Sequence, residues 1–198
     1  MLDDDDQDDG VDQQEAGADD EEHQLLFSQV MQGQVSMQSI VDDWIEAYKK
    51  SKETAMLDLI KFVIRCSGCK MSAVYATASL SSKLNSKELL RTKEFAETIS
   101  ELSDAYNEHA STCELYPLVQ TSVQARRFKA NFAEFLQLLV NQCQYSIVYD
   151  QFMFDVLIAF LVGMADSQVR AFRHTASLAC LKIMTALVTI SLITINSF

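Results

Sequence analysis

Apolar side chains recur every three or four residues along most of this chain of 198 residues, and this spacing constrains its fold more than any other feature. Between 36 and 50, the apolar residues that share one face of a 3.6-residue period are Met37, Ile40, Val41, Trp44, Ile45 and Tyr48. The same spacing predicts further helices over about 52–66, 86–102, 122–143, 151–163 and 166–195. Because no segment shows the two-residue alternation of a strand, the sequence predicts an all-α fold.

The spacing between the predicted helices indicates how they pair. A short turn separates the last two helices, which predicts an antiparallel hairpin, and barely a residue separates the first two, which predicts a tight hairpin or a kinked pair. Residues 70–85 are interpreted as a loop or a frayed helix, and 103–117 as a polar connector. Since each hairpin leaves one apolar face uncovered, stacking the hairpins into a helical solenoid buries those faces.

The first 22 residues differ from the rest in charge, because they hold twelve acidic residues and no basic one. The other 16 acidic residues are balanced by 16 basic residues, so the net charge of −12 comes from this tail. Residues 1–34 lack an apolar period and cannot bury enough apolar surface to offset the entropy of ordering. The sequence therefore predicts a disordered acidic tail over 1–34, with a small apolar island at 25–27 that could dock on a partner, and an all-helical domain over 35–198.

The segment Ala176–Ile195 is about as long as the ~20 residues that cross a bilayer. It contains Lys182 and several hydroxyl residues, and Arg170 and Arg173 precede it on the same predicted helix. These polar groups favour a long buried helix over a membrane anchor, which is the alternative. The five cysteines are odd in number and lack a disulfide spacing, which indicates reduced intracellular thiols, and no secretory leader is visible.

No constellation of residues predicts catalysis. The C-x-x-C motif at 66–69 lacks the second ligand pair of a zinc site, and it closes a helix where a thioredoxin-type motif opens one. No recognisable nucleophile or carboxylate set accompanies His23, His109 or His174, and the isolated glycines exclude a phosphate-binding loop. We therefore predict no enzymatic activity and assign no catalytic, cofactor-binding or metal-binding residue.

Basic residues gather on two of the predicted helices and suggest contact with a phosphate backbone. The candidate nucleic-acid-binding residues are Arg126, Arg127, Lys129, Arg170, Arg173 and Lys182. The alternative for such residues is a solvated helix face.

The start of the last helix carries a local signature. Asp166 is predicted to cap the helix, and Val169 and Arg170 follow in its first turn. Asp-x-x-Val-Arg at the head of a helix is typical of the second helix of a HEAT-type repeat, so the solenoid is expected to be HEAT-like. In such repeats the Arg often pairs with an Asp, which makes Asp155 or Asp166 the expected partner of Arg170.

Five blocks of sequence, in order, resemble the stromal-antigen family, the HEAT-repeat subunits of the cohesin complex. The blocks are SIVDDWIEAYK at 39–49, LDLIKF with CSGC at 57–69, FKANFAEF at 128–135, NQCQYSIVYD at 141–150 and the segment 166–188. Residues 70–116 match poorly, and after Val188 the sequence leaves the family pattern.

The resemblance implies a subunit that binds the kleisin and SMC subunits of cohesin, helps to load the ring on chromatin and supports sister-chromatid cohesion in the nucleus. It also implies sequence-independent contact of the six basic residues with the DNA backbone, and no membrane partner. Family members are several times longer, so we expect an apparently truncated N-terminal part that lacks the main kleisin-binding surface. The alternative is a truncated helical protein-interaction adaptor without cohesin function.

Overall fold

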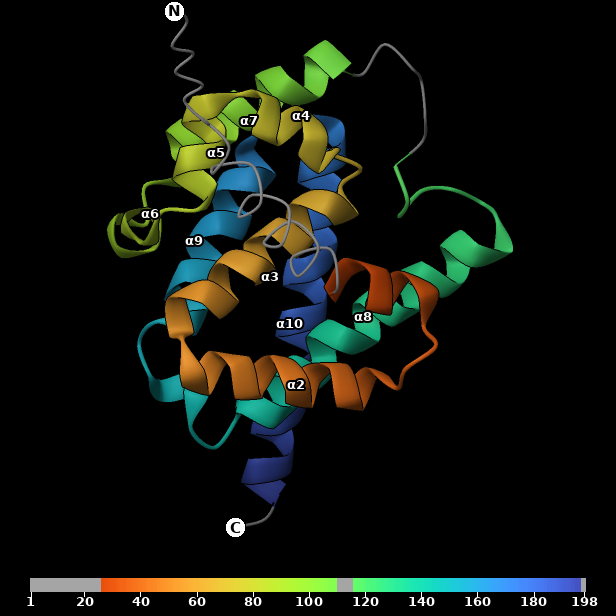
Figure 1. The fold of residues 1–198 in the computed structure, drawn as a ribbon. Helices are drawn as coiled ribbons and strands as arrows, with labels where there is room; N and C mark the ends of the chain where they lie inside the picture. The colour runs from red at the N-terminus through yellow and green to blue at the C-terminus, as the bar shows by residue number, and fades with distance from the viewer. Residues whose placement is uncertain (1–25, 110–115, 197–198) are drawn as a thin grey trace, which may run out of the picture.

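The computed structural model describes residues 26–109 and 116–196 (Figure 1). The helices in these two ranges, besides a helical segment at 26–32, are α2 (Met37–Lys50), α3 (Lys52–Cys66), α4 (Met71–Ala76), α5 (Ala78–Leu84), α6 (Lys87–Thr92), α7 (Phe95–His109), α8 (Val123–Cys143), α9 (Met153–Asp166) and α10 (Arg170–Asn196). A short 3-10 helix, Ile147–Tyr149, joins α8 to α9. Within the described ranges no residue is in a strand, and the fold is all-α, with hairpins stacked as in a HEAT-like solenoid.

Helices α2 and α3 confirm the first predicted hairpin. The hydroxyl of Ser36 accepts the amide hydrogen of Ser39 and caps α2, and Ser51 alone separates the two helices. The indole of Trp44 donates a hydrogen bond of 3.1 Å to the carbonyl of Ala55, which ties the two helices together. A hairpin, and not a continuous kinked helix, is therefore formed.

Helix α3 lies at the centre of the core, where it contacts α2, α6, α9 and α10 (Figure 1). Its residues Leu59, Ile60 and Val63 have no solvent exposure, and the ring of Phe62 packs 5.2 Å from that of Phe135 on α8. A helix that is apolar on almost every side is expected only inside a stack of other helices. The burial of α3 thus explains why its apolar stripe is wider than that of α2.

The region between α3 and α8 holds more helix than the sequence predicted. Residues 70–85 form α4 and α5, in which Leu80 and Leu84 are fully buried. The single helix predicted over 86–102 is wrong, because Lys93 adopts a left-handed conformation with φ of 55° and separates α6 from α7. The connector predicted to begin at 103 is also wrong, since α7 continues to His109. Helices α4 to α6 are only six or seven residues long, which is too short for a helical period to be recognised in the sequence.

The boundary of the predicted disordered tail at residue 34 is wrong for the part that the structure describes. Residues 26–32 are helical, Val30 is fully buried, and the ring of Phe27 lies 5.6 Å from that of Phe128 on α8. Gly33, with φ of 58°, lies directly after this helix in a left-handed conformation. The apolar island therefore docks, at least through Leu26 and Phe27, on the core of its own chain. The predicted disorder of residues 1–25 lies outside the described residues.

The turn between α9 and α10 confirms the second predicted hairpin but not its cap. Asp166 is the last residue of α9 and is exposed, so its prediction as the cap of the last helix is wrong. Ser167 instead holds the turn, because its hydroxyl accepts the amide hydrogen of Val169, the residue before α10, at 3.1 Å and lies 3.0 Å from the hydroxyl of Ser103 on α7. Ser167 is buried, whereas Asp166 is exposed.

Helix α10 changes character along its length. Its first half is in the core, with Phe172, Thr175, Ala176 and Ala179 fully buried against α8 and α9. Its second half is largely exposed, and Figure 1 shows it projecting beyond the other helices. The prediction of a buried helix therefore holds for the first half only.

The length and mean hydropathy of 2.1 of α10 are those of a membrane span, and only 17% of its most apolar window is buried. Length and composition alone do not distinguish a membrane span from a core helix. The first half of α10 is buried against α8 and α9.

Candidate nucleic-acid interface

The first turns of α8 carry three of the six candidate residues. The hydroxyl of Ser122 caps the helix by accepting the amide hydrogen of Ala125 at 3.1 Å. Ala125 and Phe128 are buried, so the residues between and beside them, Arg126, Arg127 and Lys129, are exposed. The periodicity of α8 thus places all three cations on the surface.

Arg127 is nevertheless held by the chain itself. Its guanidinium donates a hydrogen bond of 2.8 Å to the carbonyl of Gly33, and the side-chain amide of Asn131 donates one of 2.9 Å to the carbonyl of Val30. These two contacts satisfy carbonyl groups at the end of the helical segment 26–32, where no intrahelical partner exists. Arg127 therefore clamps the N-terminal segment to α8, and Asn131, which sequence reasoning missed, acts with it.

Lys129 of α8 and Arg170 of α10 are both close enough to His174 to act on its charge. Burial lowers the pKa of the His174 imidazole, and the positive charges of Lys129 and Arg170 lower it further. The ring of His174 packs 5.6 Å from that of Tyr116, at the head of the segment that leads into α8. The starts of α8 and α10 thus share one region of positive potential around His174.

Arg173 and Lys182 are not part of this region. The guanidinium of Arg173 donates hydrogen bonds of 2.9 and 2.8 Å to the carbonyls of Ser167 and Gln168, and so closes the turn between α9 and α10. Lys182 lies further along α10 and is half-buried.

The expected pairing of Arg170 with an Asp is not formed in the described ranges, where Lys93 pairs with Asp155 at 2.9 Å. Arg170 is exposed. The basic end is therefore defined as Arg126, Lys129 and Arg170, the three candidates that are exposed and, unlike Arg127 and Arg173, donate to no carbonyl group of the described chain.

The C-x-x-C motif is buried, and its chemistry follows from that burial. Burial raises the pKa of the Cys69 thiol to about 12 and that of the Cys66 thiol well above its ordinary value. Because the thiolate is the reactive and metal-binding form, both thiols are poor nucleophiles and poor ligands near neutral pH. Residues 26–109 and 116–196 hold no cluster of three acidic, His or Cys side chains that would suit a metal ion.

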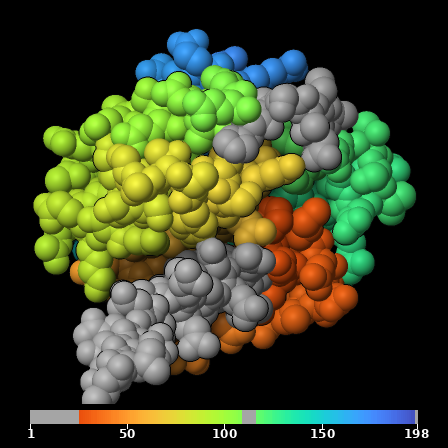
Figure 2. All heavy atoms as spheres, turned by 45° about the horizontal axis from the view of Figure 1, so that its top comes forward, coloured from red at the N-terminus to blue at the C-terminus, as the bar shows by residue number. Residues whose placement is uncertain are grey.

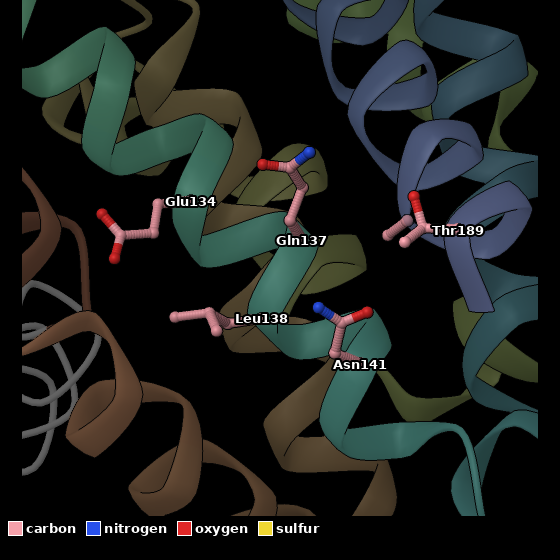
Figure 3. A pocket seen from close by; sticks show the side chains of 6 residues that line it. Glu134, Gln137, Leu138, Asn141 and Thr189 are labelled. Carbon is pink, nitrogen blue, oxygen red and sulfur yellow. The ribbon is translucent and has the colours of Figure 1, made fainter. Parts of the chain in front are cut away.

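A shallow groove of about 260 Å³ runs between α8 and α10, away from the basic end. Figure 3 shows Gln137 and Asn141 of α8 on the side facing Thr189 of α10, with Glu134 and Leu138 on the other side of α8. Amides, one carboxylate and small side chains line it, and no cation does. This groove has no feature that suits a phosphate backbone, so it is separate from the candidate interface.

The helical hairpins, the buried cysteines and the surface cations define a helical-repeat scaffold. The family model of the STAG domain matches residues 114–196. Cohesin subunit SA-1 of Xenopus laevis is 44% identical over 167 residues, which is 84% of this chain and 12% of that protein. Cohesin subunit SA-3 of Mus musculus is 40% identical over the same shares, and the putative STAG3-like protein 4 of Homo sapiens is 46% identical over 39% of this chain and 51% of its own length.

The chain belongs to the stromal-antigen family. It spans about 12% of the length of the cohesin subunits that it matches. The blocks quoted from α2, α3 and α8 to α10 are thus explained, and the structure adds that they form one continuous core.

Proposed function

We propose that this chain is a non-enzymatic subunit of cohesin, or the N-terminal part of one, that acts in chromatin association and sister-chromatid cohesion. The observation that carries this proposal is the alignment with cohesin subunits over 167 residues, which is 84% of the chain. Its proposed partners are the kleisin and SMC subunits, and its proposed location is chromatin in the nucleus, with no role at a membrane.

We further propose that the basic end contacts the backbone of duplex DNA without sequence preference. Arg126, Lys129 and Arg170 are exposed, and the described acidic side chains hold none of them in an ion pair. Each cation that reaches a phosphate releases condensed counterions, which favours binding and makes it depend on salt. Three contacts are a small number, so we expect weak binding that is strongest at low ionic strength.

Substitution of the basic end tests this contact. In the variant Arg126→Ala/Lys129→Ala/Arg170→Ala, the logarithmic salt slope of duplex binding should become shallower by about 0.9 per lost phosphate contact. The measurement is fluorescence anisotropy of a labelled duplex across a salt series. The matched control is Lys49→Ala/Lys50→Ala/Lys87→Ala, which removes the same charge from exposed positions elsewhere. Equal affinity and slope for the two triple variants would exclude the basic end.

The alternative function, a helical adaptor without a role in cohesin, is favoured by one observation. Large apolar side chains of α10 are exposed from residue 181 onward, among them Leu181, Met184 and Val188. Such a face is a common site for binding another protein. Co-purification of the chain with the kleisin and SMC subunits supports the cohesin role. Co-purification with other proteins, but without the kleisin and SMC subunits, supports the adaptor.

A further inference from the structure

The N-terminal segment is anchored beside the basic end. Phe27 packs against Phe128, which lies between Arg127 and Lys129 on α8, and Arg127 holds the carbonyl of Gly33 at 2.8 Å. The guanidinium of Arg65 also lies 4.6 Å from the centre of the Phe27 ring. Figure 2 shows this segment, in red, directly against the start of α8, in green. The chain before residue 26 is therefore joined to a helix that is anchored on the same turns of α8 that carry Arg126 and Lys129.

The segment that precedes this anchor is a polyanion by sequence. Residues 1–22 hold twelve acidic and no basic residues, including four consecutive Asp at 3–6. Consecutive residues of an extended chain are about 3.3–3.6 Å apart. Phosphates along one strand of duplex DNA are about 3.4 Å apart. An extended acidic segment would therefore space its residues about as far apart as the phosphates along one strand of DNA.

The acidic segment lies close in sequence to the anchored helix. Only residues 23–25 separate the acidic stretch from the anchored helix. Four peptide steps reach at most about 14 Å. Short flexible tethers give effective concentrations on the order of millimolar. Such a concentration allows weak charge pairing to compete with DNA that is present at much lower concentration.

We propose that the basic end of α8 and α10 is an interaction surface for the acidic segment 1–22 of its own chain, which occupies Arg126, Lys129 and Arg170 and competes with DNA for them. This inference rests on the proposed DNA contact for its consequence, but the tail contact itself does not require DNA. The surrounding charges agree with it, because Lys129 and Arg170 both act on His174 and no described carboxylate is among the charges that do.

Carbodiimide cross-linking of the full chain tests the contact in the absence of DNA. This reagent joins carboxylates to lysine amines in direct contact, and peptide mass spectrometry locates the links. We expect tail links to Lys129 at several times the yield of tail links to exposed Lys87, falling in about 0.5 M salt because the Debye length then shrinks to a few ångströms. The variant Arg126→Ala/Arg170→Ala, which keeps Lys129 and the tether, should lose most of this preference. If the yield of tail links to Lys129 changes neither with salt nor with these substitutions, the proposal is wrong.

Duplex binding then tests the competition. The neutral-tail variant replaces every Asp and Glu of residues 1–22 by Asn and Gln, and keeps length and anchor. It should bind a labelled duplex about tenfold more tightly than the parent at low salt, with the difference vanishing as salt rises. In the background Arg126→Ala/Lys129→Ala/Arg170→Ala, the same neutralisation should change affinity by less than twofold. An equal gain in both backgrounds would indicate general repulsion of DNA and overturn the competition.

The two proposals fail in different ways. If neither the parent nor the neutral-tail variant binds duplex at low salt, the proposed DNA contact is wrong, while the cross-link to Lys129 still decides the tail contact. If duplex binding depends on the basic end but no preferred link to Lys129 forms, the DNA contact stands and the tail contact is wrong.

Discussion

At the scale of single residues, Asp150 joins more of the structure than any candidate in the basic end. One carboxylate oxygen accepts the hydroxyl of Tyr48 at 2.5 Å and the ammonium of Lys52 at 3.1 Å, and the other accepts the amides of Phe152 and Met153 at 3.0 and 3.1 Å. The residue therefore links α2 and α3 to the start of α9. Sequence reasoning assigned it only to a family block, because its side-chain partners Tyr48 and Lys52 lie 102 and 98 residues earlier in the chain.

Substitution Asp150→Asn is expected to lower the free energy of unfolding by about 1–3 kcal/mol, because the buried Tyr48 hydroxyl and the Lys52 ammonium lose a charged acceptor. Urea unfolding followed by circular dichroism measures this change. Asp104→Asn, an exposed position on α7, is the control and should alter stability by less than about 0.5 kcal/mol. Equal effects of the two substitutions would contradict the role of Asp150 as a link between helices.

The pH dependence of that difference gives an independent check. Burial alone would raise the pKa of the Asp150 carboxyl, but the hydrogen bonds from Tyr48, the two backbone amides and Lys52 hold it below its ordinary value of 3.8. A carboxyl whose pKa is lower in the folded chain stabilises the fold above the unfolded pKa and loses this effect as pH falls through the folded pKa. The stability gap between the parent and Asp150→Asn should therefore be full near neutral pH and shrink below about pH 4.

At the scale of helices, the turn between α9 and α10 is held by a residue that the sequence did not predict, Ser167, and not by Asp166. Ser167→Ala removes both the hydrogen bond to the Val169 amide and the contact with Ser103 in a buried turn, and we expect a loss of about 1–2 kcal/mol in the free energy of unfolding. Asp166→Ala should cost less than about 0.5 kcal/mol, because that side chain is exposed at the end of α9. Thermal unfolding of the two variants compares them directly, and a larger loss for Asp166→Ala would restore the cap predicted from sequence.

The helices that the sequence predicted well share two features. Helices α2 and α8 bury a stripe over three or more turns, and each begins after a Ser that caps it, Ser36 or Ser122. The pieces α4 to α6 are six or seven residues long, which is less than two full turns of period. The break before α7 lies at Lys93, which adopts a left-handed conformation. Because the residue there is not a glycine, the sequence gives no signal of this break. The positions of such short helices are set by the surface on which they pack, and the local sequence pattern does not predict them.

The candidate interface was predictable in composition but not in geometry. Helical periodicity alone places Arg126 and Lys129 on the surface of α8. It cannot show that Arg127 reaches a carbonyl 94 residues earlier in the chain, or that Arg173 closes a turn behind it. Both guanidinium groups are directed by backbone carbonyls brought near by the fold, so separating positioning cations from free ones required the tertiary structure.

At the scale of the whole molecule, the projecting end of α10 exposes large apolar side chains that nothing in the described chain covers. A stripe of five apolar side chains, each more than half exposed, runs along it and is called the α10 stripe: Leu181, Met184, Val188, Leu192 and Ile195. No charged residue follows Lys182 in the described part of this helix, and hydroxyls such as those of Thr185 and Thr189 bond back to carbonyls of their own helix. Nothing polar on this end therefore opposes contact with another apolar surface.

The α10 stripe is expected to limit the solubility of the isolated chain through self-association. Val188→Lys/Leu192→Lys places two good helix formers at exposed positions, so the free energy of unfolding should change by less than about 0.5 kcal/mol while association falls. Sedimentation velocity over a concentration series measures association, and urea unfolding measures stability. The contrasting variant is Ile183→Lys, at a position that is 4% exposed, which should instead unfold the chain because it buries an unpaired charge. If the double variant associates as strongly as the parent, the attraction must come from a surface other than α10, and the groove between α8 and α10 is then the next to be substituted.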